Sequence, residues 1–233
     1  MILNSIFKKN VVSGVYSLFF KVIHAWLDFL FPPLCVCCKS FCRSGLFCLE
    51  CWDLCSLPDP IYRCRHCFLE IEEIYLNFDT FMSLDALHLL CPQCQTKPHL
   101  STPYATVFEK TAPALRLCHE IQETPEAIAA FSIHQWARLG WPIPDVIIPM
   151  PQAFSLAKPF ALWLDVPFVD VLIISDESDE CRMAQIEKNQ IILLIDKQST
   201  LYLIQKALQA LREASPKRIY VLSLIHHDFC NSF

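Results

Sequence analysis

The chain has 233 residues, of which 54% are hydrophobic, and its formal net charge is −5. This length suits one large domain or two small ones, and the negative charge disfavours a dedicated nucleic-acid-binding protein, which usually carries a basic excess. Glycine occurs only at positions 14, 45 and 140. Because phosphate-binding loops use glycine to let backbone N–H groups approach the anion, the sequence excludes a Walker loop and a GxGxxG turn.

An N-terminal segment, residues 1–31, is predicted to contain an amphipathic helix over residues 10–31. Polar residues recur there every three or four positions, and nearly all the others are apolar. The longest uncharged stretch, residues 10–20, is too short to cross a bilayer, so we expect no transmembrane span. The polar stripe has little positive charge, which favours packing against the protein over a position in the membrane interface.

Four Cys-x-x-Cys pairs in residues 32–100 are the most informative motif of the chain. Two such pairs supply the four thiolates of a closed tetrahedral zinc site. The sequence therefore predicts a double zinc ribbon with two structural zinc ions and no coordination position left for catalysis. The simplest assignment follows chain order, although the sequence also allows an interleaved pairing. In chain order, one ion is held by Cys35, Cys38, Cys48 and Cys51, and the other by Cys64, Cys67, Cys91 and Cys94.

Other interpretations of these cysteines are less favoured. A disulfide framework is typical of small secreted domains, whereas this chain shows no convincing signal peptide and concentrates its cysteines at one end. A thioredoxin-type redox pair would need a βαβ context, while an iron–sulfur cluster stays open because it also takes four thiolates. Reduced thiolates imply a reducing compartment, and hence a cytoplasmic protein. Five further residues lie near the pairs and are not needed as ligands: Cys37, Cys42, Cys55, His66 and His88.

Residues 101–233 are predicted to form an α/β domain. Short apolar runs, typical of buried parallel strands, fall at residues 104–108, 145–148, 168–174, 191–195 and 219–224. Helical patterns lie between them at residues 112–122, 125–139, 155–164 and 199–213. Strands that alternate with helices predict a doubly wound, mainly parallel sheet.

Ligands of such sheets bind beyond the carboxyl ends of the strands. Pro149-Met150-Pro151 closes one predicted strand, and Asp196 ends another, just before Ser199, Thr200 and a helix. A carboxylate and two hydroxyl groups at a helix start can bind a ribose and a phosphate. The alternative is structural, with Ser199 as an ordinary helix N-cap and Asp196 as an ordinary loop residue. These residues alone favour the structural alternative.

The chain resembles the ComF family, which comprises phosphoribosyltransferase-like proteins associated with competence for DNA uptake. The resemblance extends over nearly the whole chain, from about Trp26 to Leu224. It is carried by the leader that ends at Cys35, by the order of the four cysteine pairs, and by Pro149-Met150-Pro151. Val107-Phe108-Glu109 is similar to the strand that opens the family's transferase-like domain.

This resemblance implies a fold of phosphoribosyltransferase type. Residues 191–200 occupy the place of the family's motif for phosphoribosyl pyrophosphate (PRPP). An active member would bind PRPP and Mg²⁺ there, and Asp196, Ser199 and Thr200 are the residues that match.

Three elements that handle anions in the family are altered in this chain. Lys197 stands where the family's PRPP motif has a second acid, and Leu201-Tyr202-Leu203 fills the place of its glycine. The basic segment after Pro151 lacks arginine and glycine, and a later basic stretch is reduced to Arg182 and Lys188. We therefore expect a catalytically degenerate protein that acts through a protein partner, in DNA uptake or recombination. The alternative is a divergent active phosphoribosyltransferase, and the net charge does not support nucleic-acid binding.

Overall fold

The computed structural model describes residues 32–42, 47–71, 90–96, 102–119, 125–170, 173–174, 181–182 and 187–225. The predicted helix over residues 10–31 and His88 lie outside these residues. The chain divides into two compact units, Met1–Asp53 and Leu54–Phe233. Among the described residues, no helix combines the length and the hydrophobicity that crossing a bilayer requires.

A short hairpin and one helix make up the described part of the first unit. Leu34 and Phe41 form an antiparallel bridge in the hairpin, and the helix is α2 (Leu49–Asp53). Phe47 is buried and packs edge-on against Trp52, with ring centroids 5.2 Å apart. Segments of this size rarely bury enough apolar surface to fold unaided, so the cysteines of this unit are expected to supply much of its stability.

Four parallel strands form the core of the second unit, in the order β1-β6-β5-β2. They are β1 (Tyr104–Phe108), β2 (Val146–Pro149), β5 (Ile191–Asp196) and β6 (Arg218–Ile225). Nearly every residue of these strands is buried, as expected for a parallel sheet that is covered on both faces. The α/β class and the mainly parallel sheet predicted from the sequence are confirmed.

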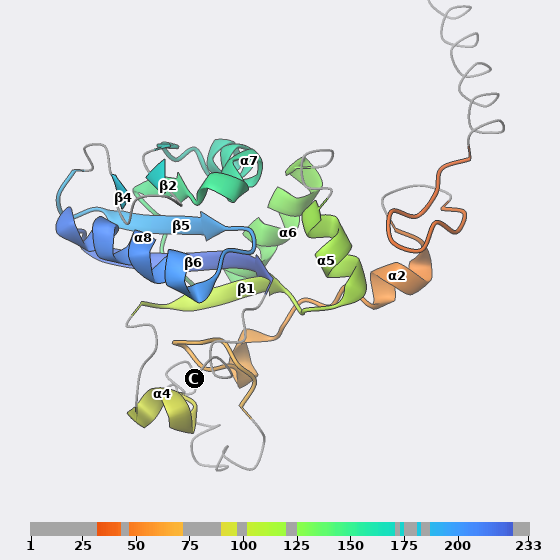
Figure 1. Cartoon of the computed structure of the whole chain (residues 1–233), viewed down its shortest axis with the longest axis horizontal. Helices are drawn as coiled ribbons and strands as arrows, with labels where there is room; N and C mark the ends of the chain where they lie inside the picture. Colours follow the sequence, from red (N-terminus) through yellow and green to blue (C-terminus); the bar gives the residue numbers. More distant parts are fainter. Residues whose placement is uncertain are drawn as a thin grey trace, which may run out of the picture. The chain divides into compact units, whose positions relative to one another are not determined.

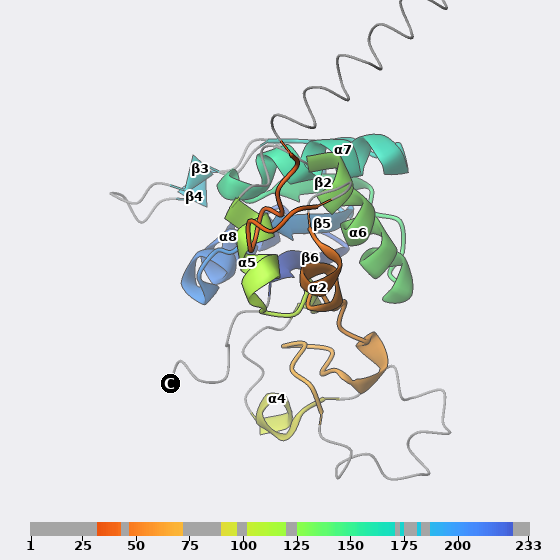
Figure 2. The ribbon, with the colours of Figure 1, turned by 90° about the vertical axis from the view of Figure 1, so that its right-hand side faces the viewer.

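Helices cover both faces of this sheet (Figures 1 and 2). Helix α8 (Leu201–Glu213) lies on one face, and α6 (Pro125–Arg138) and α7 (Phe154–Leu164) pack together on the other. The inner face of α8 buries leucine, isoleucine and alanine side chains at helical spacing. The remaining helices are short: α4 (Pro92–Thr96), α5 (Ala112–His119) and the 3₁₀ turns η1 (Pro60–Tyr62) and η4 (Pro151–Ala153).

The strand predicted over residues 168–174 is not one continuous strand of the sheet. Phe168 forms a parallel bridge with Ile147 of β2, so only the beginning of this segment pairs with the sheet. Ile173–Ile174 forms β3, which pairs antiparallel with β4 (Cys181–Arg182) in a separate two-stranded sheet. Asp170 interrupts the apolar run, and aspartate is unfavourable within strands.

The segment around Cys64 is fastened to the α/β domain of the second unit. The Arg63 guanidinium forms an ion pair with Glu109, the residue that follows β1. Two side chains of α6, Gln135 and Arg138, donate hydrogen bonds to the carbonyl oxygen of Pro58, at 2.9 Å and 3.3 Å. Gln135 is fully buried, so its amide needs this partner. The second cysteine-rich hairpin is therefore built into the same unit as the sheet.

Candidate functional site

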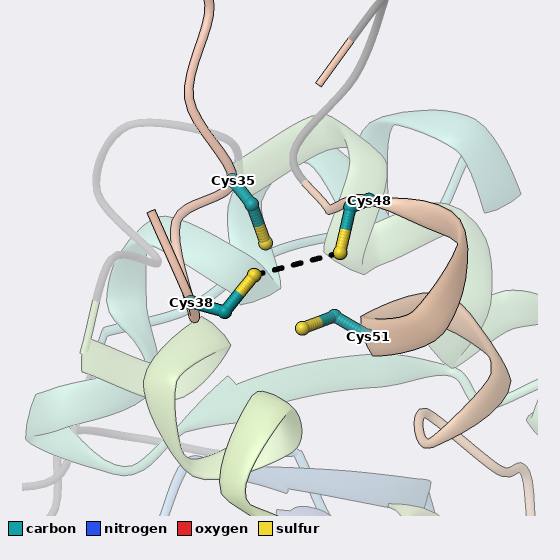
Figure 3. Close-up of side chains that lie close together, drawn as sticks. All are labelled: Cys35, Cys38, Cys48 and Cys51. Atoms are coloured by element: carbon teal, nitrogen blue, oxygen red, sulfur yellow. Dashed lines mark hydrogen bonds between the residues drawn. The ribbon is translucent and has the colours of Figure 1, made fainter. Parts of the chain in front are cut away.

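Two groups of four cysteines gather their sulfur atoms. In each group the four Sγ atoms lie within 4.8 Å of one another. The first cysteine group consists of Cys35, Cys38, Cys48 and Cys51, and the second of Cys64, Cys67, Cys91 and Cys94. Figure 3 shows the side chains of the first group pointing toward a common centre, with Cys51 projecting from α2. The grouping follows chain order and is not interleaved.

The spacing of the sulfur atoms suits a tetrahedral metal ion. Four thiolates at the usual Zn–S distance of about 2.3 Å lie about 3.8 Å from one another. Cys38 and Cys48 place their sulfur atoms 3.5 Å apart, and Cys67 and Cys91 place theirs 3.7 Å apart. Four soft ligands with no oxygen donor among them favour zinc over hard cations. Each group can hold a zinc ion with little rearrangement.

Both groups are built from the same backbone hairpin, residues 33–42 in the first and 62–71 in the second. Cys35 N–H donates to Ser40 O and Cys64 N–H donates to Leu69 O, each at 2.8 Å. Each of these cysteines also accepts a hydrogen bond at its carbonyl oxygen from the N–H four residues later. The donor is Lys39 for Cys35 and Phe68 for Cys64. The second Cys-x-x-Cys of each group also opens a short helix, α2 or α4. The sequence shows the repeated cysteine pairs but not this repeated hairpin.

Each hairpin contains one residue in the left-handed conformation, Lys39 with φ 61° and Phe68 with φ 59°. A side chain costs about 1–2 kcal/mol in this region, which glycine adopts freely. Phe68 is buried, so its packing offsets this backbone cost, whereas the exposed side chain of Lys39 offers no such compensation.

Lys39→Gly is expected to stabilise the first cysteine group by about 1 kcal/mol, because it relieves this backbone cost. Zinc retained against a competing chelator measures the effect, and about fivefold tighter retention corresponds to that free energy. Lys39→Ala is the matched control, since it removes the same side chain and keeps the Cβ atom. An equal gain from Lys39→Ala would contradict the role of the left-handed backbone.

The second cysteine group distributes its protons unevenly. A hydrogen bond from the Cys67 thiol lowers the pKa of Cys64 to about 4, against the opposing effect of burial. The same hydrogen bond, followed by burial, raises the pKa of Cys67. Burial and then the charge of Cys64 raise the pKa of Cys94 to about 12. One sulfur is therefore ready to act as a thiolate, and a cation must displace protons from its neighbours.

The first group has a similar low-pKa member. Burial alone would raise the pKa of Cys35, but backbone N–H groups of Cys38, Cys48 and Cys37 outweigh it and lower the pKa to about 6. Such oriented N–H groups stabilise a thiolate, which is the form that ligates metal.

The other cysteines and histidines near the pairs take no part in either group. The Cys42 thiol donates a hydrogen bond to the carbonyl oxygen of Phe47 at 2.9 Å. Cys37, Cys55 and His66 are likewise not members of the two groups. Cys118 is buried in α5, where desolvation raises the pKa of its thiol to about 12, so it stays protonated at neutral pH.

The carboxyl end of β5 is the second candidate site. Asp196 is fully buried there, and its carboxylate accepts hydrogen bonds from the Ser199 backbone N–H at 3.1 Å and from the Ser223 hydroxyl at 2.8 Å. Ser223 lies on β6 directly across from Asp196. Asp196 is thus not an ordinary loop residue, because its carboxylate joins β5, β6 and the start of the following loop.

Thr200, and not Ser199, is the N-cap of α8. Its hydroxyl accepts a hydrogen bond from Leu203 N–H at 3.4 Å, and the helix begins at Leu201. Ser199 is buried, with its N–H already bonded to Asp196. The structural alternative that made Ser199 the cap is therefore wrong by one residue. The structure brings Asp196, Ser199 and Thr200 together between β5 and α8, and it engages the Asp196 carboxylate, the Ser199 N–H and the Thr200 hydroxyl in hydrogen bonds within the chain.

Comparisons with known proteins give no match to a family model and none to a curated protein. Among solved structures, the chain matches UMP synthase from Leishmania donovani at 17% identity and a TM-score of 0.36, with 50% of this chain and 25% of that chain covered. Adenine phosphoribosyltransferase from Leishmania tarentolae matches at 19% identity and a TM-score of 0.33, with 46% and 72% covered. The enzyme from Trypanosoma brucei, solved with AMP, pyrophosphate and ribose-5-phosphate, matches at 18% identity and a TM-score of 0.34, with 49% and 69% covered. This chain thus spans only a quarter of the UMP synthase. Matches with such low identities and TM-scores do not indicate what this chain binds.

Proposed function

We propose that this chain is a zinc-stabilised, ComF-like protein whose phosphoribosyltransferase-type domain has lost catalysis and acts through a protein partner. The observation that carries this proposal is the state of Asp196, which is fully buried and bonded to Ser199 and Ser223. A carboxylate that is to bind ribose hydroxyls must present its oxygen atoms to the ligand. Here the oxygen atoms are directed to groups of the same chain.

The loop after Asp196 supports the same conclusion. Lys197 places a positive charge where a second carboxylate would help to bind ribose and Mg²⁺. The chain has no glycine between residues 141 and 233, so side chains surround the backbone N–H groups at the start of α8. Glycine is the residue that lets such groups approach a phosphate closely.

Zinc has a structural role in this proposal. Each cysteine group offers four thiolates to one ion, and a closed four-thiolate shell leaves no position for water or substrate. The groups require a reducing environment, which supports a cytoplasmic location. The role in DNA uptake or recombination rests on the resemblance to the ComF family. A protein partner is favoured over nucleic acid because the net charge of the chain is −5.

Calorimetric titration of the zinc-loaded protein with PRPP and Mg²⁺ tests the loss of catalysis. We expect no heat of binding and no thermal stabilisation at millimolar PRPP. Binding at micromolar affinity, about −8 kcal/mol, would contradict the proposal and favour a divergent active phosphoribosyltransferase. In that case Asp196→Asn should abolish PRPP binding. Asp145→Asn is the control and should leave PRPP binding unchanged, because Asp145 contacts the opposite end of β5.

A further inference from the structure

Two cavities open at the amino edge of the sheet, the edge opposite to Asp196. The larger has a volume of about 650 Å³ and is bordered by the second hairpin, the end of α6 and the starts of β1 and β6. The smaller, of about 570 Å³, is bordered by the same hairpin, the end of α8 and the starts of the same two strands. Both volumes lie in the range of small-ligand sites. Arg65 and Arg218 line both cavities.

Arginine is concentrated around these cavities. The chain has eight arginines, and the five that line the cavities are Arg63, Arg65, Arg138, Arg212 and Arg218. No aspartate or glutamate is among the described residues that line either cavity. These cavities thus concentrate arginine in a chain whose net charge is −5. Guanidinium groups bind phosphate in a fork geometry, so the lining favours a phosphorylated anion.

Carboxylates that are not part of either lining pair with two of these arginines. Arg63 pairs with Glu109, and a second carboxylate, that of Glu70, lies 3.6 Å from its guanidinium. Arg138 lies 3.5 Å from Asp59 and donates to the carbonyl oxygen of Pro58. Arg218, in contrast, sits with its guanidinium carbon 5.3 Å from the centre of the Tyr220 ring. Arg63 and Arg138 thus shape the wall, and Arg218 brings a positive charge beside an aromatic surface.

The larger cavity also has an aromatic wall. Trp141 follows Gly140, whose φ of 61° turns the chain at the end of α6. The ring centroids of Trp141 and Tyr220 lie 4.9 Å apart. Both residues line the cavity, as does Phe68 of the second hairpin. Trp141 is half-buried, so part of the indole faces the cavity. Aromatic faces of this kind stack with planar rings such as nucleobases.

The smaller cavity offers polar groups without an aromatic wall. Arg212 donates to the Thr102 hydroxyl at 3.1 Å, which fixes one guanidinium at the rim. His66 also lines this cavity, and its Nδ1 atom is buried with no hydrogen-bond partner among the described residues. A buried polar atom without a partner is costly unless a ligand or water completes it.

We propose that this pair of cavities binds a nucleoside diphosphate or a close analogue. The planar base would stack on Trp141 in the larger cavity, and the diphosphate would lie at Arg65 and Arg218, the arginines shared by both cavities. A small ligand is favoured over a nucleic-acid strand because five of the eight arginines line these two cavities and the chain as a whole is negatively charged. This proposal does not depend on the PRPP loop, which lies at the other edge of the sheet.

Calorimetric titration of the zinc-loaded full chain with ADP, pyrophosphate and an oligothymidylate tests the proposal. We expect saturable ADP binding that Arg218→Ala and Arg65→Ala each weaken by about tenfold or more. Arg218→Lys should recover only part of the affinity, because lysine keeps the charge and loses the fork. Arg116→Ala, in α5 and outside both linings, is the control and should bind ADP normally.

Trp141→Ala separates the aromatic contribution from the charge. It should weaken ADP binding and leave pyrophosphate binding unchanged, while the melting temperature of each variant reports its folding. Three results would overturn the proposal: no saturable ADP binding at millimolar concentration, equal affinity for ADP and pyrophosphate, or binding of the oligothymidylate without binding of ADP.

Discussion

Cys64→Ser is expected to lower the zinc content from two ions per chain to one and to unfold the second hairpin. Structural zinc contributes about 10–16 kcal/mol of apparent binding energy at neutral pH, and in a small module this is folding energy. Serine provides no thiolate, so the shell formed with Cys67, Cys91 and Cys94 is left incomplete. Because Arg63 and Pro58 attach this hairpin to Glu109 and α6, the α/β domain should also become less stable.

Zinc released after denaturation, counted with a colorimetric chelator, measures the first effect, and thermal unfolding measures the second. Cys37→Ser is the control, since Cys37 lies beside the first group without belonging to it. This variant should retain two ions. A Cys64→Ser protein that keeps two zinc ions and an unchanged melting temperature would contradict the assignment of Cys64 as a ligand.

Asp196→Ala is expected to destabilise the second unit by about 3 kcal/mol. The substitution removes the acceptor of the Ser199 N–H and the closer of the two acceptors of the buried Ser223 hydroxyl, whose other acceptor is the carbonyl oxygen of Ile225 at 3.1 Å. Hydrogen bonds to charged groups contribute about 1.5–3 kcal/mol each. It also opens space beside two buried strands. Urea denaturation of the zinc-loaded protein measures the change in free energy of unfolding.

Asp145→Ala is the matched control for this experiment. Asp145 precedes β2, and its carboxylate accepts a hydrogen bond from Ile191 N–H at 2.7 Å, at the amino end of β5. Asp145 is exposed, so water can replace the lost acceptor and we expect a loss of about 1 kcal/mol or less. If both variants lost equally little stability, the carboxylate of Asp196 would not be a structural group, and its availability to PRPP would need to be reconsidered.

Local patterns in the sequence predicted most of the elements of the α/β domain. The apolar run that begins at Ile191 is β5, and the helical spacing of apolar residues after Thr200 is α8. The four Cys-x-x-Cys pairs similarly indicated that the two sulfur atoms of each pair would meet, whereas the structure was needed to show which pairs share a group. In these cases the information lies within a few residues of the chain.

Features that depend on the alignment of distant segments could not be predicted. Ser223 lies 27 residues after Asp196 and becomes its partner only through the register of β5 and β6. The displaced cap of α8 has a local cause, because the Asp196 carboxylate accepts the Ser199 N–H and the helix starts one residue later. Each arginine-lined cavity likewise combines residues from four separate stretches of the chain.

The repeated hairpin also bears on how the two ions would be retained when zinc is scarce. Nine residues separate Cys38 from Cys48, whereas 23 residues separate Cys67 from Cys91. Closing the longer spacer costs about 0.8 kcal/mol more in chain entropy, which by itself would favour loss of the second ion. The attachment of the second hairpin to the α/β domain opposes that loss. Which ion leaves first therefore depends on whether this packing outweighs the entropy cost of the longer spacer.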